Sequence, residues 1–259
     1  MSNTQYTIRS TQYAVRSLWR LLLRYRFLLF QRHRHDRLVL EEVAGTPILV
    51  LPSVFNPKLF RTGEFLVETL DARLIPPGST VLDMGTGSGV GAVFAARWAR
   101  RVVAVDINPA AVRCARINAL LHQVEDRIEV RQGDLFEPAC SEQFDVVLFN
   151  PPFFHGEPRN DLERALWAND VVERFAAGLG DHLTPEGHAV VILSSDGDVA
   201  GFLQAFQANG LGAELIAQRN LVTETLMIYR LSRGEASRIE DSSANEPALR
   251  LASPLQRTD

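Results

Sequence analysis

The tetrapeptide Asn150-Pro151-Pro152-Phe153 combines residue types that can hold a planar nitrogen atom. It follows the apolar run "FDVVLF", and two successive prolines prevent any further strand or helix, so Asn150 is expected at the tip of a buried strand. The side-chain carbonyl of Asn150 and the backbone carbonyl of Pro151 both accept hydrogen bonds. Two such acceptors suit a nitrogen that carries two N–H donors, and Phe153 can stack on a flat substrate. In isolation, Asn-Pro-Pro can equally be a plain turn.

A glycine-rich turn, "DMGTGSGVG", indicates a second site. Asp83 ends the preceding apolar run, and Gly85, Gly87 and Gly89 follow before a helix-forming stretch. Glycines at these positions let the backbone turn sharply and let a ligand approach without Cβ atoms in the way. A tight strand-to-helix turn without a ligand can have the same sequence, so the glycines alone leave both interpretations open.

Two further carboxylates favour a ligand. Asp106 ends the next apolar run, 19 residues after Gly87, where an acid in this topology accepts hydrogen bonds from ribose hydroxyls. Asp134 follows a third run and is expected to reach an adenine edge. A crevice with three carboxylates suits a ribose, an adenine and a cationic group better than a diphosphate, because Asp83 would lie against the phosphate charges. The sequence therefore favours S-adenosylmethionine, which has a sulfonium and an ammonium but no phosphate, over NAD.

The chemistry that these two sites predict together is methyl transfer to nitrogen. An amide or exocyclic amino nitrogen is a poor nucleophile, because its lone pair is delocalised into the carbonyl or the ring. Accepting both of its hydrogens at Asn150 and Pro151 favours the pyramidal geometry of the transition state and aims the lone pair at the methyl group. The proton leaves after the nitrogen has become cationic, so no strong base is required beforehand.

The elements that must position these residues alternate along the chain. Apolar runs that alternate with helical stretches predict an α/β fold: a doubly wound, mostly parallel, seven-stranded sheet with helices on both faces. The last two strands lie close together in sequence and predict a closing antiparallel hairpin. The expected strands are 80–85, 101–108, 127–134, 144–150, 188–195, 213–220 and 225–231, and the expected helices are 57–74, 89–99, 109–123, 167–183 and 199–210.

The N-terminal part of the chain is basic. Residues 9–37 contain eight arginines and one acid, while the whole chain has a net charge of −4. Residues 11–33 have the periodicity of an amphipathic helix, which could pack on the domain, contact RNA or the ribosome, or lie on a membrane surface. Its arginines recur too often for a transmembrane span, and no signal peptide is expected. Residues 37–52 predict a β-hairpin.

These patterns divide the chain into three parts. We expect an N-terminal helix and hairpin extension at 1–53, a catalytic domain at 54–232 and a disordered tail at 233–259, which is rich in Ser, Glu, Arg and Pro. The two cysteines, Cys114 and Cys140, lie far apart without CxxC spacing or a nearby histidine. This usage excludes a disulfide scaffold, makes no case for a metal site and fits a reducing cytoplasm.

Taken together, the motifs resemble the class I S-adenosylmethionine-dependent methyltransferases of the "small" or HemK-like kind, over roughly residues 54–231. The resemblance implies S-adenosyl-L-methionine as the cofactor. It also implies that residues Asn150 to Phe153 bind the nitrogen atom that accepts the methyl group. It also implies that the upstream segment "VFNPKLFRTGEF" closes over the cofactor through Phe55, Pro57 and Thr62. The cofactor-binding residues that it implies are Phe55, Thr62, Asp83, Gly85, Thr86, Gly87, Gly89, Asp106, Ile107, Asp134, Leu135 and Asn150.

Two positions depart from the family pattern. HemK-like sequences tend to have an acid immediately before the threonine that corresponds to Thr62, where this chain has Arg61. Some members have a tyrosine after the second proline, where this chain has Phe153. The resemblance favours a protein glutamine amide as the methyl acceptor. An RNA guanine or adenine amino group, a small molecule, and an inactive methyltransferase-fold binding protein stay open as alternatives. The polar loop after Phe153, which contains His155 and Trp167, is where substrate choice is expected.

Overall fold

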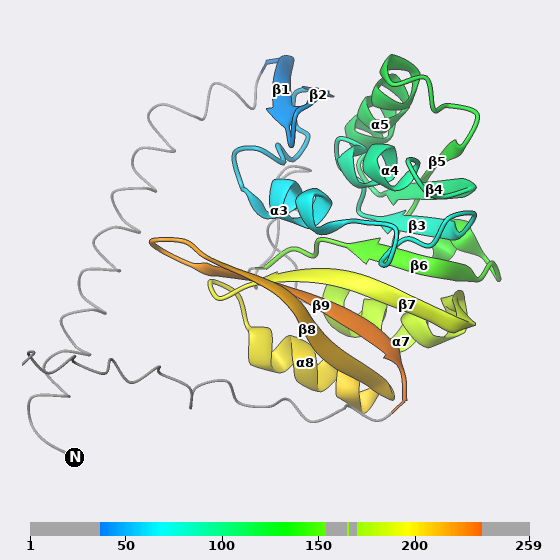
Figure 1. Cartoon of the computed structure of the whole chain (residues 1–259), viewed down its shortest axis with the longest axis vertical. Helices are drawn as coiled ribbons and strands as arrows, with labels where there is room; N and C mark the ends of the chain where they lie inside the picture. Colours follow the sequence, from blue (N-terminus) through cyan, green and yellow to red (C-terminus); the bar gives the residue numbers. More distant parts are fainter. Residues whose placement is uncertain (1–36, 154–164, 166–169, 235–259) are drawn as a thin grey trace, which may run out of the picture.

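The computed structural model describes residues 37–153, 165 and 170–234. Its centre is a seven-stranded sheet with the order β5-β4-β3-β6-β7-β9-β8, beside a separate two-stranded sheet (Figure 1). Strands β3 to β7 pair in parallel. Because β3 lies between β4 and β6, the chain winds outward in both directions from β3, and such a switch point is where open α/β sheets bind ligands. The predicted fold class is confirmed.

The parallel strands form because their sequences are nearly continuous runs of apolar and β-branched residues. Strands β3, β4 and β6 are buried almost throughout, as expected for strands that helices cover on both faces. The five strands are β3 (Thr80–Met84), β4 (Arg101–Asp106), β5 (Ile128–Gln132), β6 (Phe144–Phe149) and β7 (Leu183–Ser194).

The closing hairpin consists of β8 (Leu211–Asn220) and β9 (Thr225–Arg233). Strand β9 pairs antiparallel with both β7 and β8, so β8 forms the edge of the sheet. The connection between β8 and β9 is too short for a crossover, which is why the pair can only be antiparallel.

Helices cover both faces of the sheet. Helices α3, α4 and α5 lie on one face with the two-stranded sheet, and α7 and α8 lie on the other (Figure 1). Gly133 to Phe136 lead from β5 into a short 3-10 helix. The bounds are α3 (Thr62–Thr69), α4 (Val90–Ala95), α5 (Pro109–Leu121), η2 (Glu137–Ala139), α7 (Val171–His182) and α8 (Val199–Ala208).

Two hydrophobic cores follow from the alternation of side chains along each strand. In β3, Val81 belongs to the core beneath α4 and α5, whereas Leu82 and Met84 belong to the core beneath α7 and α8. The same alternation places Asp83 on the same face of the sheet as Val81, beneath α4 and α5.

The predicted N-terminal hairpin is confirmed as β1 (Val39–Val43) and β2 (Thr46–Val50), paired antiparallel. A buried asparagine of α5 holds it against the domain. Asn118 Oδ1 accepts from the backbone N–H of Leu49 at 2.9 Å, and its Nδ2 donates to the carbonyls of Leu49 and Ser88 at 2.7 and 2.8 Å. The hairpin therefore shares hydrogen bonds with α5 and an apolar core with the domain.

Three predicted bounds were wrong. The helix expected over 57–74 is only α3, because Arg61 adopts a left-handed conformation with φ 60° directly before it. The helix expected over 89–99 ends at Ala95. Strand β7 begins at Leu183 rather than at 188, since Leu183 already pairs with Phe144 before a register shift.

Some predictions fall on residues outside the described ranges. These are the basic helix at 11–33, most of the loop with His155 and Trp167, and nearly all of the tail at 233–259. Within the described part of the chain, no helix is both long and apolar enough to cross a membrane.

Candidate active site

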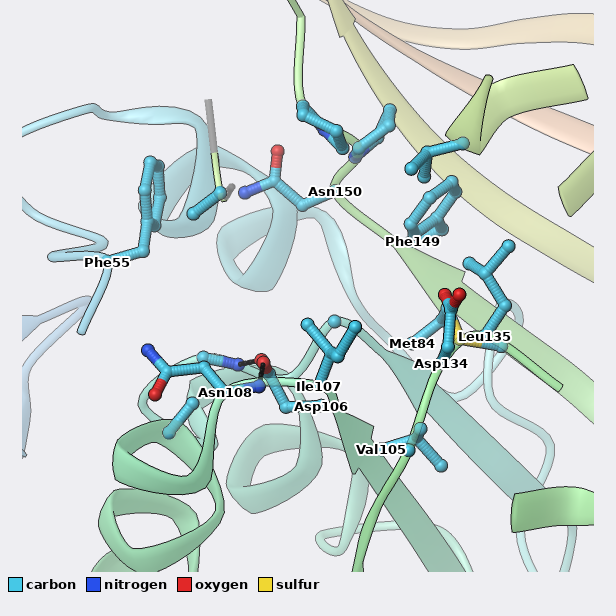
Figure 2. Close-up of a pocket in the computed structure, with 18 of the residues that line it drawn as sticks. Phe55, Met84, Val105, Asp106, Ile107, Asn108, Asp134, Leu135, Phe149 and Asn150 are labelled. Carbon is cyan, nitrogen blue, oxygen red and sulfur yellow. Dashed lines mark hydrogen bonds between the residues drawn. The ribbon is translucent and has the colours of Figure 1, made fainter. Parts of the chain in front are cut away.

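A pocket opens at the carboxyl ends of β3, β4, β5 and β6 and brings the predicted motifs together (Figure 2). Eleven of the predicted site residues line it: Phe55, Gly85, Gly87, Asp106, Ile107, Asp134, Leu135, Asn150, Pro151, Pro152 and Phe153. Four predicted cofactor residues are not among its lining residues: Thr62, Asp83, Thr86 and Gly89. The two motifs, separated by about 60 residues in the sequence, therefore share one cavity.

The glycine turn between β3 and α4 requires glycine for two separate reasons. Gly85, Gly87 and Gly89 have φ values of 63°, 56° and 83°, in the left-handed region that disfavours residues with a Cβ atom. At Gly89 a Cβ would also lie 2.7 Å from Cα of Ala115 in α5. Gly85 and Gly87 instead face the pocket, where their bare backbone leaves room for a ligand. Gly89 thus serves helix packing, while the first two glycines shape the cavity.

Asp106 connects the glycine turn with the start of α5. Its Oδ2 accepts from the backbone N–H of Gly87 at 2.8 Å, and its Oδ1 accepts from the backbone N–H of Asn108 at 2.9 Å. Asn108 in turn caps α5 by accepting from Ala110 N and donates to the carbonyl of Ser53. Asp106 lines the pocket, and carboxylate oxygens are the acceptors that hydroxyl donors of a ligand would require.

Asp83 does not face the pocket, contrary to the prediction. It is 5% exposed and lies beneath the turn, where one carboxylate oxygen accepts from Oγ1 of Thr86 at 2.5 Å and from Ala92 N at 2.8 Å. Burial raises the pKa of Asp83 to about 6, and the nearby Asp106 carboxylate adds to this shift. Thr86 is turned toward Asp83, so both residues support the turn from below.

Asp134 and Leu135, which follow β5, form another part of the pocket wall. Asp134 lines the pocket, and its Oδ2 accepts from the Arg174 guanidinium of α7 at 2.6 Å. Leu135 has a left-handed φ of 48° and, like Ile107, presents an apolar side chain to the cavity. An acid between apolar neighbours can bind the polar edge of a flat ring, as the prediction for Asp134 requires.

Asn150 lies at the end of β6, and one of the two polar atoms of its side chain receives no hydrogen bond from the described residues. Its Nδ2 donates to Oγ1 of Thr62 at 3.2 Å. Its Oδ1 is buried, and no group in the described ranges donates to it. An unsatisfied buried carbonyl costs on the order of 1–3 kcal/mol. Because Asn150 lines the pocket, this unpartnered acceptor points to a ligand that donates a hydrogen bond there.

The residues around Asn150 are packed tightly. Phe149 stacks on Phe175 of α7, with ring centroids 4.1 Å apart, which anchors the end of β6. Phe153 is 8% exposed, and its backbone carbonyl lies so close to Gly197 that a Cβ there would be 2.8 Å away. Pro151 is buried as well. The end of the pocket at Asn150 is therefore closely packed on both sides of that residue.

The upstream segment supplies one pocket residue and one supporting residue. Phe55 lines the pocket beside Asn150 (Figure 2) and stacks on Phe60, with ring centroids 4.5 Å apart. Thr62 is 2% exposed and contacts Asn150 rather than the cavity. Pro57 packs against Gly63, where a Cβ would lie 2.6 Å from the proline Cβ.

The sequence prediction missed Asn108, Ser53 and Met84, which also line the pocket. Asn108 could have been found, because an asparagine directly before Pro109 is a typical helix N-cap. Met84 could have been found from strand alternation, since it faces the opposite way from Asp83. Ser53 has no such signal, because its backbone carbonyl, rather than its side chain, contacts Asn108.

Comparisons with known proteins identify the family of this chain. The family model described as the methyltransferase small domain matches residues 45–210. A relative from Methanocaldococcus jannaschii, named as a candidate protein N5-glutamine methyltransferase, is 28% identical over 74% of this chain and 98% of its own. The release factor glutamine methyltransferase of Geobacter sulfurreducens is 37% identical over 48% of this chain. The match covers only 41% of that enzyme, less than two thirds of its length.

Solved structures with the same fold include two methyltransferases. The 16S rRNA N2 G1207 methyltransferase of T. thermophilus, solved with AdoMet and guanosine, has a TM-score of 0.58 at 20% identity and covers 76% of this chain and 50% of its own. The Mtq2–Trm112 complex of E. cuniculi, described as responsible for methylating the termination factor eRF1, has a TM-score of 0.55 at 22% identity and covers 70% and 99%. With a family match over well more than half of its length, the chain belongs to the methyltransferase small domain family and is a class I methyltransferase.

Proposed function

We propose that this enzyme transfers a methyl group from S-adenosylmethionine to the side-chain amide nitrogen of a protein glutamine. The observation that carries the proposal is the buried Oδ1 of Asn150, which receives no hydrogen bond from the described residues, in the pocket that also contains the glycine turn and Asp106. A primary amide has two N–H donors and can satisfy this acceptor. The apolar and aromatic surroundings suit a neutral, planar acceptor group better than a charged one.

The residues of the pocket fit S-adenosylmethionine. Gly85 and Gly87 provide a backbone surface without Cβ atoms, and the carboxylate of Asp106 lines the pocket where it can accept from ribose hydroxyls. Ile107, 41% exposed at the pocket, can cover one face of an adenine, and Asp134 can accept from its amino group. The lack of phosphate-binding cations among these lining residues also favours this cofactor over a dinucleotide.

The chain's own contribution to the reaction is to hold the acceptor nitrogen. S-adenosylmethionine supplies an electrophilic methyl group on a sulfonium. Asn150 Oδ1 and the backbone carbonyl of Pro151 accept the two amide hydrogens, which turns the nitrogen lone pair away from its carbonyl and toward the cofactor side of the pocket. Phe153 and Phe55 exclude water and bound the flat acceptor group.

Glutamine is the preferred acceptor because of the relatives. The candidate N5-glutamine methyltransferase of M. jannaschii aligns along nearly its whole length with this chain, so the two share a domain of the same extent. The similarity to the release factor enzyme supports the same acceptor class over a shorter segment. An RNA guanine amino group also carries two N–H donors, so methylation of RNA is the alternative that the experiment must exclude.

The test is methyl transfer from S-adenosylmethionine with a radiolabelled methyl group to three separate preparations: purified release factors, ribosomal proteins and protein-free ribosomal RNA. We expect label in protein, and N5-methylglutamine after digestion and mass spectrometry. Label confined to the RNA, or a methylated residue other than glutamine, would refute the glutamine assignment. Titration calorimetry with S-adenosylmethionine and NAD checks the cofactor independently of the acceptor.

A further inference from the structure

Thr62 occupies an unusual position for a residue predicted to contact the cofactor. It is the first residue of α3, 2% exposed, and lies outside the pocket lining. Its hydroxyl accepts the side-chain N–H of Asn150 at 3.2 Å, across 88 positions of sequence. A buried hydroxyl thus joins the upstream segment to the tip of β6.

The segment around Thr62 is held firmly enough to position that hydroxyl. Arg61 is in the left-handed conformation, and the backbone N–H of Thr62 donates to the carbonyl of Phe60 at 2.7 Å. Pro57 packs against Gly63 so closely that no larger residue fits there. The direction of the Thr62 side chain is therefore set by backbone contacts on both sides of it.

The bond matters because an asparagine side chain can present either of its two ends to the pocket. With Nδ2 committed to Thr62, the remaining end is the carbonyl Oδ1, which is buried and receives no donor from the described residues. With the amide turned over, the Thr62 hydroxyl would have to donate to Oδ1 instead, and the Nδ2 N–H groups of Asn150 would face the N–H groups of the substrate amide and repel them. Only the orientation with Oδ1 toward the pocket lets Asn150 accept a hydrogen bond from an amide nitrogen.

We propose that Thr62 is a positioning residue for methyl transfer: its hydroxyl holds the amide of Asn150 with the carbonyl toward the acceptor nitrogen. Thr62 therefore acts on the acceptor through Asn150 and does not itself touch the cofactor. This inference rests on the proposed role of Asn150 as the group that accepts the amide hydrogen. It also assigns a second task to the upstream segment, whose Phe55 bounds the pocket.

The test compares Thr62→Val, which removes the hydroxyl and keeps the shape, with Thr62→Ser, which retains the hydroxyl. Thr69→Val in the same helix is the matched control, because the Thr69 hydroxyl bonds only to the carbonyl of Phe65 one turn earlier. We expect Thr62→Val to lower kcat by about tenfold or more, as for a buried amide left without its partner. Affinity for S-adenosylmethionine should stay within about twofold, and Thr62→Ser and Thr69→Val should retain near-normal kcat.

A double-mutant cycle separates positioning from general loss of structure. In an Asn150→Ala background, Thr62→Val should have almost no further effect on kcat, because the amide that it orients is gone. If Thr62→Val lowered kcat by the same factor in both backgrounds, or weakened cofactor binding as much as turnover, the positioning role would be refuted.

A measurement without acceptor or cofactor distinguishes this inference from the proposed function. The side-chain amide of Asn150 gives a pair of signals in a ¹H–¹⁵N spectrum, assigned by their loss in Asn150→Ala. Thr62→Val should shift this pair and speed its exchange with water, and Thr62→Ser should not. An unchanged pair in Thr62→Val overturns the inference. A shifted pair in an enzyme that methylates no glutamine overturns the proposed function alone.

Discussion

The backbone N–H of Gly87 donates to Oδ2 of Asp106 at 2.8 Å, so the glycine turn of β3 and the end of β4 are held together by one carboxylate. The other oxygen of Asp106 accepts from the N–H of Asn108, which caps α5. The acid that is expected to bind the ribose therefore also shapes the cavity before any ligand enters. Cofactor affinity should depend on both acceptor oxygens.

Replacing Asp106 with Asn tests this double role. The amide nitrogen of Asn cannot accept, so either Gly87 or Asn108 loses its acceptor. We expect affinity for S-adenosylmethionine to fall about tenfold to a hundredfold, as for the loss of a hydrogen bond to a charged group. Titration calorimetry measures the effect, and Asp126→Asn, at an acid whose side chain is 79% exposed, is the control. Equal affinity in the two variants would mean that Asp106 does not contribute.

Glycine can be required by a left-handed backbone or by a close neighbour that leaves no room for a Cβ atom. Gly78 and Gly89 allow these two effects to be measured separately. Both have φ 83°, but a Cβ at Gly78 meets nothing within 4 Å, whereas one at Gly89 lies 2.7 Å from Cα of Ala115. Gly78→Ala should lose about 1–2 kcal/mol of unfolding free energy from backbone strain alone. Gly89→Ala should lose about 1–3 kcal/mol more from overpacking against α5. Urea unfolding with an unchanged m-value measures both, and equal losses would contradict the close contact.

Much of the fold was predictable because burial on both faces of a parallel sheet leaves an unmistakable pattern. Strands such as β4, "RVVAVD", and β6, "FDVVLF", are apolar along nearly their whole length, and the short connection before Thr225 admits only an antiparallel pair. The bounds of α3 could not be predicted. They depend on the left-handed Arg61 and on the contact between Pro57 and Gly63, which are tertiary features.

For the site, the sequence predicts which residues gather at the sheet edge better than which way they point. Asp106, Asp134 and Asn150 were expected there because parallel strands end on one side, and they line the pocket. The direction of Asp83 was available from alternation with Met84, but its place at the end of a strand beside the glycine turn was interpreted as a place in the crevice. The bond from Asn150 to Thr62 joins distant segments, and no local pattern predicts it.

Asp83→Asn should stabilise the protein above pH 6. Burial raises the pKa of Asp83 to about 6 from an ordinary value of 3.8, so the folded state favours the protonated form. The contribution of protonated Asp83 to the free energy of unfolding is fully present below pH 3.8 and is lost as the pH rises through about 6. Asn mimics the neutral, protonated acid, because its single carbonyl oxygen can still accept from both Ala92 N and Oγ1 of Thr86. The variant should therefore gain up to about 3 kcal/mol at pH 8, and nothing near pH 4.

Urea unfolding of both proteins between pH 4 and 8 measures this difference. His188 titrates in the same window, since burial lowers its pKa to about 4, and its contribution is lost as the pH falls from 6.5 toward 4. Because His188 is present in both proteins, its effect cancels in the difference between them. A difference that stays constant with pH would mean that Asp83 does not titrate there.

Asn150→Ala should separate turnover from cofactor binding. The variant removes the carbonyl that is expected to accept the amide hydrogen, and loss of one preorganised polar group costs about 2–4 kcal/mol in the transition state. The kcat should then fall roughly 30-fold to 1000-fold, while affinity for S-adenosylmethionine changes little. Asn209→Ala, at an exposed asparagine that ends α8 and bonds to Ala205, is the matched control. An equal loss of cofactor affinity in Asn150→Ala would mean that Asn150 supports the cofactor rather than the acceptor.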